Sequence, residues 1–188
     1  SLLSRVNYKW NSIMQKIIFI FLLLSPALFS ACVKDKDKPE EMANYINVGD
    51  KLPEFTVKNT DGEELKSQDF TGRVTLLVFF MTTCPDCQRE LPKIEQVWEN
   101  LKENPDFRLV PIARAEKAEV ISQFWEKHQF EMPFYLDPDR QVFSLFANNT
   151  IPRIYLINRE NVVTWMAIED MSLTALQLKE KIEKLIKK

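Results

Sequence analysis

Apolar residues in this chain form two kinds of block, continuous runs and runs at helical spacing. Arg73–Met81 (RVTLLVFFM) and Phe107–Ala113 (FRLVPIA) are continuous runs rich in β-branched and aromatic residues, a pattern typical of strands buried on both faces of a sheet. Between them, apolar residues recur with the period of a helix, at Leu91, Ile94, Val97, Trp98 and Leu101. The pattern predicts a strand, then a helix that starts near residue 84, then a second strand.

The remaining blocks continue this alternation of strands and helices. After the second run we expect, in order, a helix over Lys117–Gln129, an extended piece at Met132–Leu136, a helix over Arg140–Ala147, strands at Ile154–Ile157 and Val162–Ile168, and a terminal helix over Leu173–Ile186. Ahead of the first run, Lys51–Lys58 and Glu63–Lys66 flank Asn59-Thr60-Asp61-Gly62, where Asp-Gly is a strong hairpin signal. The order predicts an α/β fold: a mixed β-sheet flanked by helices on both faces, with an N-terminal β-hairpin extension.

The first residues have a different pattern. Every residue of Ile17–Leu24 is apolar, Lys16 precedes this run, and the small pair Ser30-Ala31 follows it at a short distance. A membrane-spanning helix needs about 20 apolar residues, so the segment fits the three regions of a secretory signal better. We assign residues 1–31 to a signal peptide, with Met14 as an alternative start of translation.

The signal ends in Phe29-Ser30-Ala31-Cys32, which resembles a bacterial lipoprotein signal. In that family the cysteine is lipidated, although Phe29 departs from the usual aliphatic residue. The resemblance implies a lipid on Cys32, a flexible charged tether over residues 32–44, and a single domain over residues 45–188. That domain would face the periplasm or the cell surface, where disulfides persist. A plain signal peptide with a free Cys32, or an uncleaved anchor, remains the alternative.

Composition excludes several classes of function. The formal net charge of −2 argues against nucleic acid as a partner, since nucleic-acid-binding domains are usually basic. His128 is the one histidine, so no Cys/His cluster suited to zinc is available and we expect no metal. Three cysteines are too few for a disulfide scaffold. The chemistry therefore has to be sought at the two neighbouring cysteines.

Cys84-Pro85-Asp86-Cys87 lies between a predicted buried strand and the start of a predicted helix. With Cys84 as the N-cap, Pro85 occupies the first helical position, where its missing N–H costs nothing. Cys87 then lies one turn on, close enough to bridge back. Unpaired N–H groups and the helix dipole would stabilise a thiolate on Cys84, whereas the negative charge of Asp86 opposes it. This context predicts thiol–disulfide exchange.

The block Leu76–Pro92 (LLVFFMTTCPDCQRELP) resembles thioredoxin-fold proteins of the TlpA/ResA type, in the AhpC/TSA–Redoxin-related superfamily. The likeness extends over residues 47–187 through Lys51–Phe55, Leu136–Asp139 and Thr150-Ile151-Pro152. It implies a thioredoxin-like fold and a membrane-tethered, extracytoplasmic oxidoreductase that reduces protein disulfides. It also implies a membrane electron donor of the CcdA/DsbD type and no cofactor beyond the redox-active Cys84–Cys87 disulfide.

The resemblance implies further site residues. Ile151–Pro152 would be a cis peptide beside the cysteines whose preceding backbone pairs with the substrate. Glu90, one turn past Cys87, would relay the proton of that thiol; an exposed helix glutamate is the alternative. Substrate contacts are assigned to Thr83, Pro85, Asp86 and Ile151.

Two departures from the family pattern are informative. Thr83 replaces the tryptophan that many relatives carry, which weakens any inference about the substrate. Val78 stands where cytoplasmic thioredoxins carry a buried aspartate, which leaves Glu90 as the main candidate acid.

The predicted mechanism is attack of the Cys84 thiolate on a substrate disulfide, followed by displacement of the mixed disulfide by Cys87. One alternative is a thiol peroxidase, in which Cys84 attacks peroxide and Cys87 resolves the sulfenic acid. Against it, Met81 stands where peroxiredoxins usually carry a threonine. The other alternative is a non-enzymatic, lipid-anchored binding module with a structural disulfide.

Overall fold

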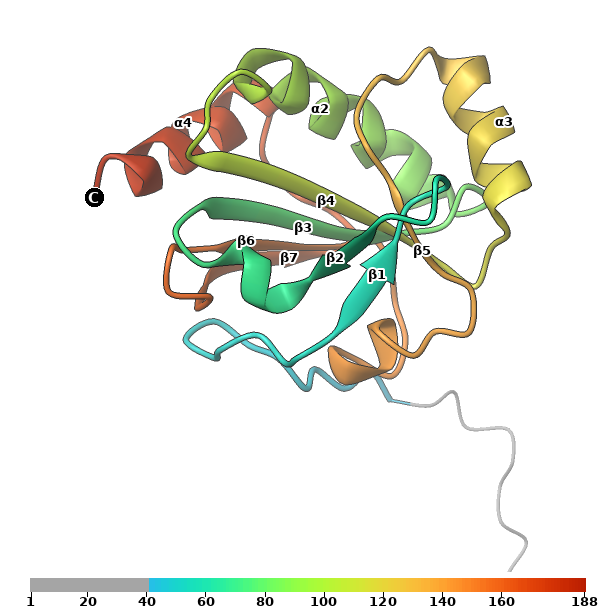
Figure 1. Ribbon diagram of the computed structural model, residues 1–188, viewed down its shortest axis with the longest axis horizontal. Coiled ribbons are helices and arrows are strands. Elements are labelled where there is room, and N and C mark those ends of the chain that lie inside the picture. Colours follow the sequence, from blue (N-terminus) through green and yellow to red (C-terminus); the bar gives the residue numbers. More distant parts are fainter. Residues whose placement is uncertain (1–40) are drawn as a thin grey trace, which may run out of the picture. The chain divides into compact units, whose positions relative to one another are not determined.

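A seven-stranded mixed sheet organises the part of the chain that the computed structural model describes, residues 41–188 (Figure 1). The spatial order of the strands is β2-β1-β5-β4-β3-β6-β7. Their bounds are β1 Thr56–Lys58, β2 Glu64–Lys66, β3 Val74–Phe80, β4 Phe107–Arg114, β5 Tyr135–Asp137, β6 Arg153–Ile157 and β7 Val163–Ile168. The predicted signal peptide and Cys32 lie outside the described residues.

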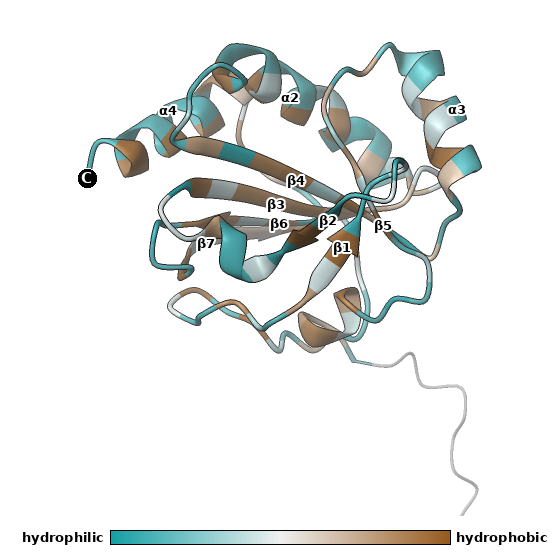
Figure 2. Cartoon of the chain, in the orientation of Figure 1, coloured by the Kyte–Doolittle hydropathy of each residue, from teal (hydrophilic) through white to brown (hydrophobic). Residues whose placement is uncertain are grey.

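The central strands place the carboxyl ends of β3 and β4 at one edge of the sheet. These two strands are parallel and in register from Val74 opposite Phe107 to Phe80 opposite Ala113. β6 runs antiparallel to β3, so its first residue, Arg153, lies at the same edge. All seven residues of β3 are buried, as its continuous apolar run predicts. Figure 2 shows the strands as the brown, apolar interior of the fold.

Three α-helices cover one face of the sheet (Figure 1): α2 Pro85–Leu101, α3 Ala118–His128 and α4 Ala175–Ile186. The units β3-α2-β4 and β4-α3-β5 are both parallel crossovers that step the same way across the sheet. Because such crossovers are right-handed, their helices lie on the same face. The return from β5 to β6 steps the other way and covers the opposite face with the short 3-10 helix η2, Phe143–Leu145.

The predicted fold, a mixed sheet flanked by helices, is confirmed, but the helix expected over Arg140–Ala147 is only this 3-10 turn. The backbone N–H groups of Val142 and Phe143 donate to the Asp137 carboxylate at 3.1 and 2.8 Å. Arg140 is left-handed, with φ 58°, and Ala147 forms a β-bridge to Asn44. A segment held at both ends in this way has no room for two α-helical turns.

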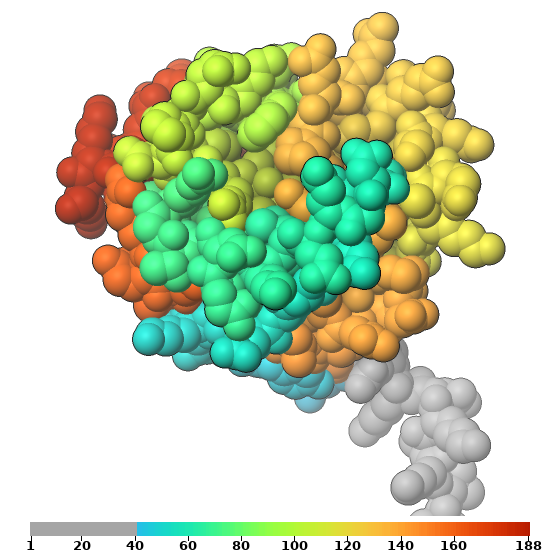
Figure 3. All heavy atoms as spheres, viewed as in Figure 1, coloured from blue at the N-terminus to red at the C-terminus, as the bar shows by residue number. Residues whose placement is uncertain are grey.

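The N-terminal hairpin is present as predicted, but its first strand is shorter. Only Thr56–Lys58 of the expected Lys51–Lys58 pairs with β2; Lys51 makes a single bridge to Val162. Pro53 has no N–H to give to a ladder, which explains the interruption. β1 joins the sheet through β5, and the hairpin forms the teal part of the visible face (Figure 3).

Residues that the sequence assigns to the end of the tether contact the folded domain. The backbone N–H of Ala43 donates to Asn148 Oδ1 at 2.8 Å, and Asn44 Oδ1 accepts from Arg153 Nη1 at 2.6 Å. The segment just before residue 45 is thus bound beside the loop that precedes β6. Within residues 41–188, no helix is both long and apolar enough to cross a membrane.

Candidate redox site

Cys84 is the N-cap of α2, four residues after the end of β3. Its backbone is extended, with φ −84° and ψ 120°, and its sulfur accepts from the Cys87 N–H at 3.4 Å. Pro85 opens the helix, and α2 continues through Pro92 to Leu101. The sequence prediction for the start of this helix is confirmed. A free helical N–H therefore points at the Cys84 sulfur, which favours the thiolate.

Cys87 has the opposite environment. It is fully buried, whereas Cys84 is partly exposed, and both are free thiols. Burial raises the pKa of Cys87 far above its ordinary value of 9.0, because the thiolate would lose its hydration; a hydrogen bond with the Met81 backbone lowers it by less. Of the two sulfurs, only Cys84 can meet a substrate first.

Ile151 and Pro152 lie beside Cys84, and the peptide bond between them is cis, as the resemblance implied. The Cys84 sulfur is 3.7 Å from the Ile151 carbonyl oxygen. Thr150, just before them, has φ 68°, which is unusual for a β-branched residue. Ile151 and Pro152 are buried, and Thr150 is partly buried. The backbone of this loop therefore reaches the sulfur that faces solvent.

Glu90 is buried in α2 with 1% of its surface exposed, so the alternative of an exposed helix glutamate is wrong. Its carboxylate accepts from Lys93 Nζ at 2.9 and 3.1 Å and from Arg89 Nε at 3.2 Å. Among residues 41–188, the hydrogen bonds of this carboxylate go to these two cations and to neither cysteine. The predicted relay of the Cys87 proton stays a prediction.

Thr83, Pro85 and Asp86 surround Cys84 on the outside. Thr83 and Pro85 are exposed. Asp86 accepts from Arg89 Nη1 at 2.6 Å, and this ion pair offsets the negative charge that the sequence placed beside the thiolate. These three residues form the rim that a partner of Cys84 would touch.

The sequence analysis missed a clamp on the residue two before Cys84. Glu116, which follows β4 and is only 9% exposed, accepts from the Thr82 N–H and from Thr82 Oγ1, both at 2.7 Å. Gln88 Nε2 donates to the Thr82 carbonyl at 2.7 Å. Thr82 and Glu116 are 34 positions apart, so no local pattern links them. An acid directly after a buried strand was the one available signal.

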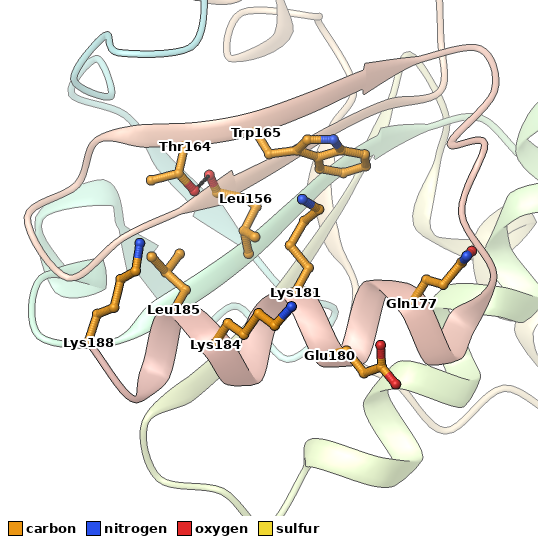
Figure 4. A pocket seen from close by; sticks show the side chains of 9 residues that line it. All are labelled: Leu156, Thr164, Trp165, Gln177, Glu180, Lys181, Lys184, Leu185 and Lys188. Carbon is orange, nitrogen blue, oxygen red and sulfur yellow. Dashed lines mark hydrogen bonds between the residues drawn. The ribbon is translucent and has the colours of Figure 1, made fainter.

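The cysteines do not line a deep cavity. A groove of 340 Å³ lies elsewhere, between β7 and α4, where Lys181 Nζ is 5.8 Å from the centre of the Trp165 ring (Figure 4). Neither cysteine lines it. Within residues 41–188 no cluster of His, Cys, Asp or Glu could hold a metal ion.

Comparison with known proteins gives the same fold and chemistry. The Redoxin family matches residues 47–185. Thiol-disulfide oxidoreductase ResA of Bacillus anthracis is 23% identical over 184 residues, 96% of this chain and 98% of that protein. ResA of Bacillus subtilis (strain 168) is 28% identical over 130 residues, 67% of this chain and 72% of that protein.

Solved structures are similar as well. A putative protein disulfide isomerase from Bacteroides thetaiotaomicron superposes with a TM-score of 0.73 at 29% identity, over 78% of this chain and 94% of that chain. StoA from Bacillus subtilis superposes with a TM-score of 0.58 at 25% identity, over 68% and 96%. The predicted thioredoxin-like fold is confirmed.

Proposed function

The chain belongs to the Redoxin family and is a thiol–disulfide oxidoreductase, and from that premise we propose that it is a membrane-tethered reductant of extracytoplasmic protein disulfides. The observation that supports this most is the unequal pair at the start of α2. Cys84 is partly exposed beside the Ile151 carbonyl, and Cys87 is buried one turn behind it.

The reaction we propose uses that inequality in two exchanges. The Cys84 thiolate attacks one sulfur of a substrate disulfide, a Cys84–substrate bond forms, and the other substrate sulfur leaves as a thiolate. Cys87 then loses its proton and attacks Cys84. The Cys84–Cys87 bond forms, and the first substrate sulfur leaves as a thiolate that takes up a proton. The substrate gains two electrons and the cysteine pair loses two.

Substrate binding in this proposal uses the rim around Cys84. The backbone at Ile151, beside the Cys84 sulfur, would pair with an extended segment of a protein, as in strand addition. Thr83, Pro85 and Asp86 would contact the residues that flank the substrate cysteine. Glu90, one turn past Cys87, would accept the proton of that thiol, and it lies in an ion pair with Lys93.

Membrane attachment and electron supply complete the proposal. The lipoprotein-like end of the signal at Cys32 and the charged tether that follows it would hold the domain at a membrane outside the cytoplasm. Oxidised Cys84–Cys87 must then be reduced again, and a membrane electron donor of the CcdA/DsbD type would do so by the same exchange chemistry.

Trapping with the full chain tests the function. Cys87→Ser retains the attacking thiol and removes the resolving one, so the variant should accumulate a stable, reductant-sensitive mixed disulfide with envelope proteins in growing cells. Cys84→Ser is the matched control and should trap nothing. The adducts should be recovered with membranes, and Cys32→Ser should release them.

Three results would contradict parts of this proposal. Absence of any adduct with Cys87→Ser would contradict disulfide exchange. Wild-type Cys84 and Cys87 found mainly oxidised in growing cells would contradict the reductant role. Faster loss of the Cys84 thiol to hydrogen peroxide than to a protein disulfide would favour the thiol peroxidase.

A further inference from the structure

The last residue of β4 is an arginine close to the redox pair. β4 lies parallel to β3 with Ala113 opposite Phe80, so Arg114 ends its strand at the edge where the loop to Cys84 begins. Glu116, two residues later, is hydrogen-bonded to Thr82, two residues before Cys84. The end of β4 is therefore tied directly to the segment that carries the attacking sulfur.

The Arg114 guanidinium has no matching acid or acceptor within residues 41–188. Its Nε and Nη1 atoms are buried and have no hydrogen-bond partner there, and no salt bridge in that range includes it. The guanidinium instead makes a cation–π contact, with its Cζ 4.3 Å from the centre of the Phe143 ring. Buried donors of a cation that lack acceptors are costly, so such a group is expected to serve an anion.

Two further arginines, Arg140 and Arg153, act electrostatically on Arg114, and because they are also cations they do not neutralise its charge. Arg140 Cζ lies 5.4 Å from the centre of the same Phe143 ring. Arg153 is fully buried and donates to Asn44 and to the carbonyls of residues 149 and 150. Burial lowers the pKa of Arg114, these arginines lower it further, and the two cysteines, as thiolates, raise it. The thiolates are thus the anions within its reach.

The acids around the pair already have partners. Asp86 is bound by Arg89, and Glu90 by Lys93 and Arg89. Glu116 is occupied by Thr82, and Asp137 by the N–H groups of residues 142 and 143. After β7, Glu169 and Asp170 are exposed to solvent. Arg114 is left as a half-buried cation with two buried, unpaired guanidinium nitrogens at this end of the described sheet.

We propose that Arg114 is a positioning residue of the redox site, whose unmatched positive charge stabilises the thiolates of the reduced Cys84–Cys87 pair. The inference rests on the proposed function in one respect, that Cys84 is the attacking sulfur. In the oxidised protein the pair is neutral and Arg114 has no counter-charge. On reduction, two electrons enter, the S–S bond breaks, and the thiolate that remains after one sulfur is protonated supplies that counter-charge.

The charge also bears on the resolving step. Cys87 must lose its proton to attack the mixed disulfide, and burial opposes this. Arg114 lowers the pKa of Cys87 against that larger effect of burial. A cation held here, without a competing acid, assists both the first and the second exchange.

The test compares the two half-buried arginines of β4. Arg114→Met removes the charge and keeps an unbranched chain of similar length. Arg108→Met is the matched control, because Arg108 is also half-buried and also lies over a phenylalanine, Phe70, at 5.6 Å, but at the opposite end of the strand. Arg114→Lys keeps the charge.

The measurement is the rate at which iodoacetamide alkylates Cys84 in reduced full-length protein, recorded from pH 5 to 10. In Arg114→Met the midpoint of the profile should move up by about half to one pH unit, a three- to tenfold loss of thiolate below the midpoint. The limiting rate at high pH should not change. Arg108→Met should keep the wild-type midpoint, and Arg114→Lys should recover most of the shift.

The redox equilibrium with glutathione, measured above the midpoint, gives a second reading. The reduced form should become about three- to tenfold less favoured in Arg114→Met, so that the reduction potential falls by about 15–30 mV.

Equal midpoints in wild type and Arg114→Met would overturn the proposal. So would a loss of limiting rate without a shift of midpoint, which indicates a purely structural role. If Arg114→Met does not fold, the alkylation midpoints of Arg114→Gln and Arg114→Lys are compared instead. The proposal then requires a higher midpoint in Arg114→Gln, and equal midpoints would overturn it. Since iodoacetamide needs no protein partner, failure here is distinct from failure of the trapping experiment.

Discussion

The two ends of the central strands β3 and β4 differ in how their charges are matched. At the amino ends, two arginines have acceptors. Arg108 Nη1 donates to the Asp69 carbonyl at 2.6 Å, and Arg159 Nη1 donates to the Gly72 carbonyl at 2.7 Å and to Asp106 at 3.1 Å. At the carboxyl ends Arg114 has buried N–H groups without acceptors in the described part of the chain.

The backbone shows the same contrast. Left-handed, non-glycine residues lie beside the carboxyl ends, Ala115 at φ 58° after β4 and Thr150 at φ 68° before β6, whereas the left-handed residue after β6 at the amino end is Asn161, a residue type that tolerates this conformation. Ala115 and Thr150 each cost about 1–2 kcal/mol relative to ordinary conformations. Next to them lies Cys87, a titratable group with no access to solvent. Costly backbone conformations and a buried titratable group therefore lie together beside the reacting cysteines.

Because Cys87 is buried at the carboxyl ends of the strands, we expect the free energy of unfolding of the reduced protein to depend on pH in the alkaline range. Since the folded-state pKa of Cys87 is raised, the buried thiol keeps its proton when the unfolded chain loses it near the ordinary value of 9.0. The contribution to stability is complete below that pH and is lost as the pH rises, at about 1.4 kcal/mol per pH unit. Reduced wild-type protein should lose about 2–3 kcal/mol between pH 9 and 11 from this source.

Urea unfolding of the reduced protein from pH 7 to 11 measures this effect. Cys87→Ser lacks the buried thiol and retains Cys84, so the difference between the two pH dependences isolates Cys87. Parallel curves for the two proteins would show that Cys87 ionises in the fold as it does in the unfolded chain.

The clamp on Thr82 should give the next largest effect. In Glu116→Gln the amide oxygen can accept from the Thr82 N–H and the NH₂ group can donate to Thr82 Oγ1, so two short charge-assisted hydrogen bonds inside the fold become weaker neutral ones. The expected cost is about 1–3 kcal/mol in the free energy of unfolding, measured with urea at pH 7. The exchange rate should fall too, because the Cys84 loop is released.

Glu119→Gln is the matched control for this prediction. Glu119 is exposed in the first turn of α3, three residues after Glu116, and its change to glutamine should alter stability little and exchange not at all. Equal effects of the two substitutions would remove the reason for assigning Glu116 to the site.

Local patterns in the sequence sufficed for much of this fold. The apolar run before Cys84 predicted β3, and helical spacing after it predicted α2, with Cys84 at the N-cap. The segment Arg140–Ala147 also has apolar residues at helical spacing, yet the Asp137 carboxylate and the bridge from Ala147 to Asn44 restrict it to a 3-10 turn. The bridge to Asn44 joins residues that are far apart along the chain, so no local pattern predicts it.

The site divides in the same way. Cys84 and Cys87 were readable from four consecutive residues, and Ile151–Pro152 came only through a family resemblance. Glu116 and Arg114 escaped notice because their roles depend on the pairing of β4 with β3, which places residue 113 beside residue 80. Which residues of β3 and β4 lie side by side depends on the register of the two strands, and a short stretch of sequence does not determine that register.

The smallest effect is expected at the amino end of the sheet, where charges are matched but exposed. The hydrogen bond from Arg159 is the main reason that the pKa of Asp106 is lowered, so this pair stabilises the fold above the ordinary value of 3.8 and stops doing so as the pH falls through the folded value. Both side chains are partly exposed, at 33% for Arg159 and 47% for Asp106, and exposed pairs contribute little. Asp106→Asn should lower the thermal midpoint by at most about 2 °C at pH 7, with the difference decreasing as the pH falls through the folded-state pKa of Asp106. Its exchange rate should equal that of wild type, because this end of the strands holds no reacting group. A loss of exchange in Asp106→Asn would mean that the two ends of the sheet are coupled, and the division between a chemical end and a structural end would then have to be abandoned.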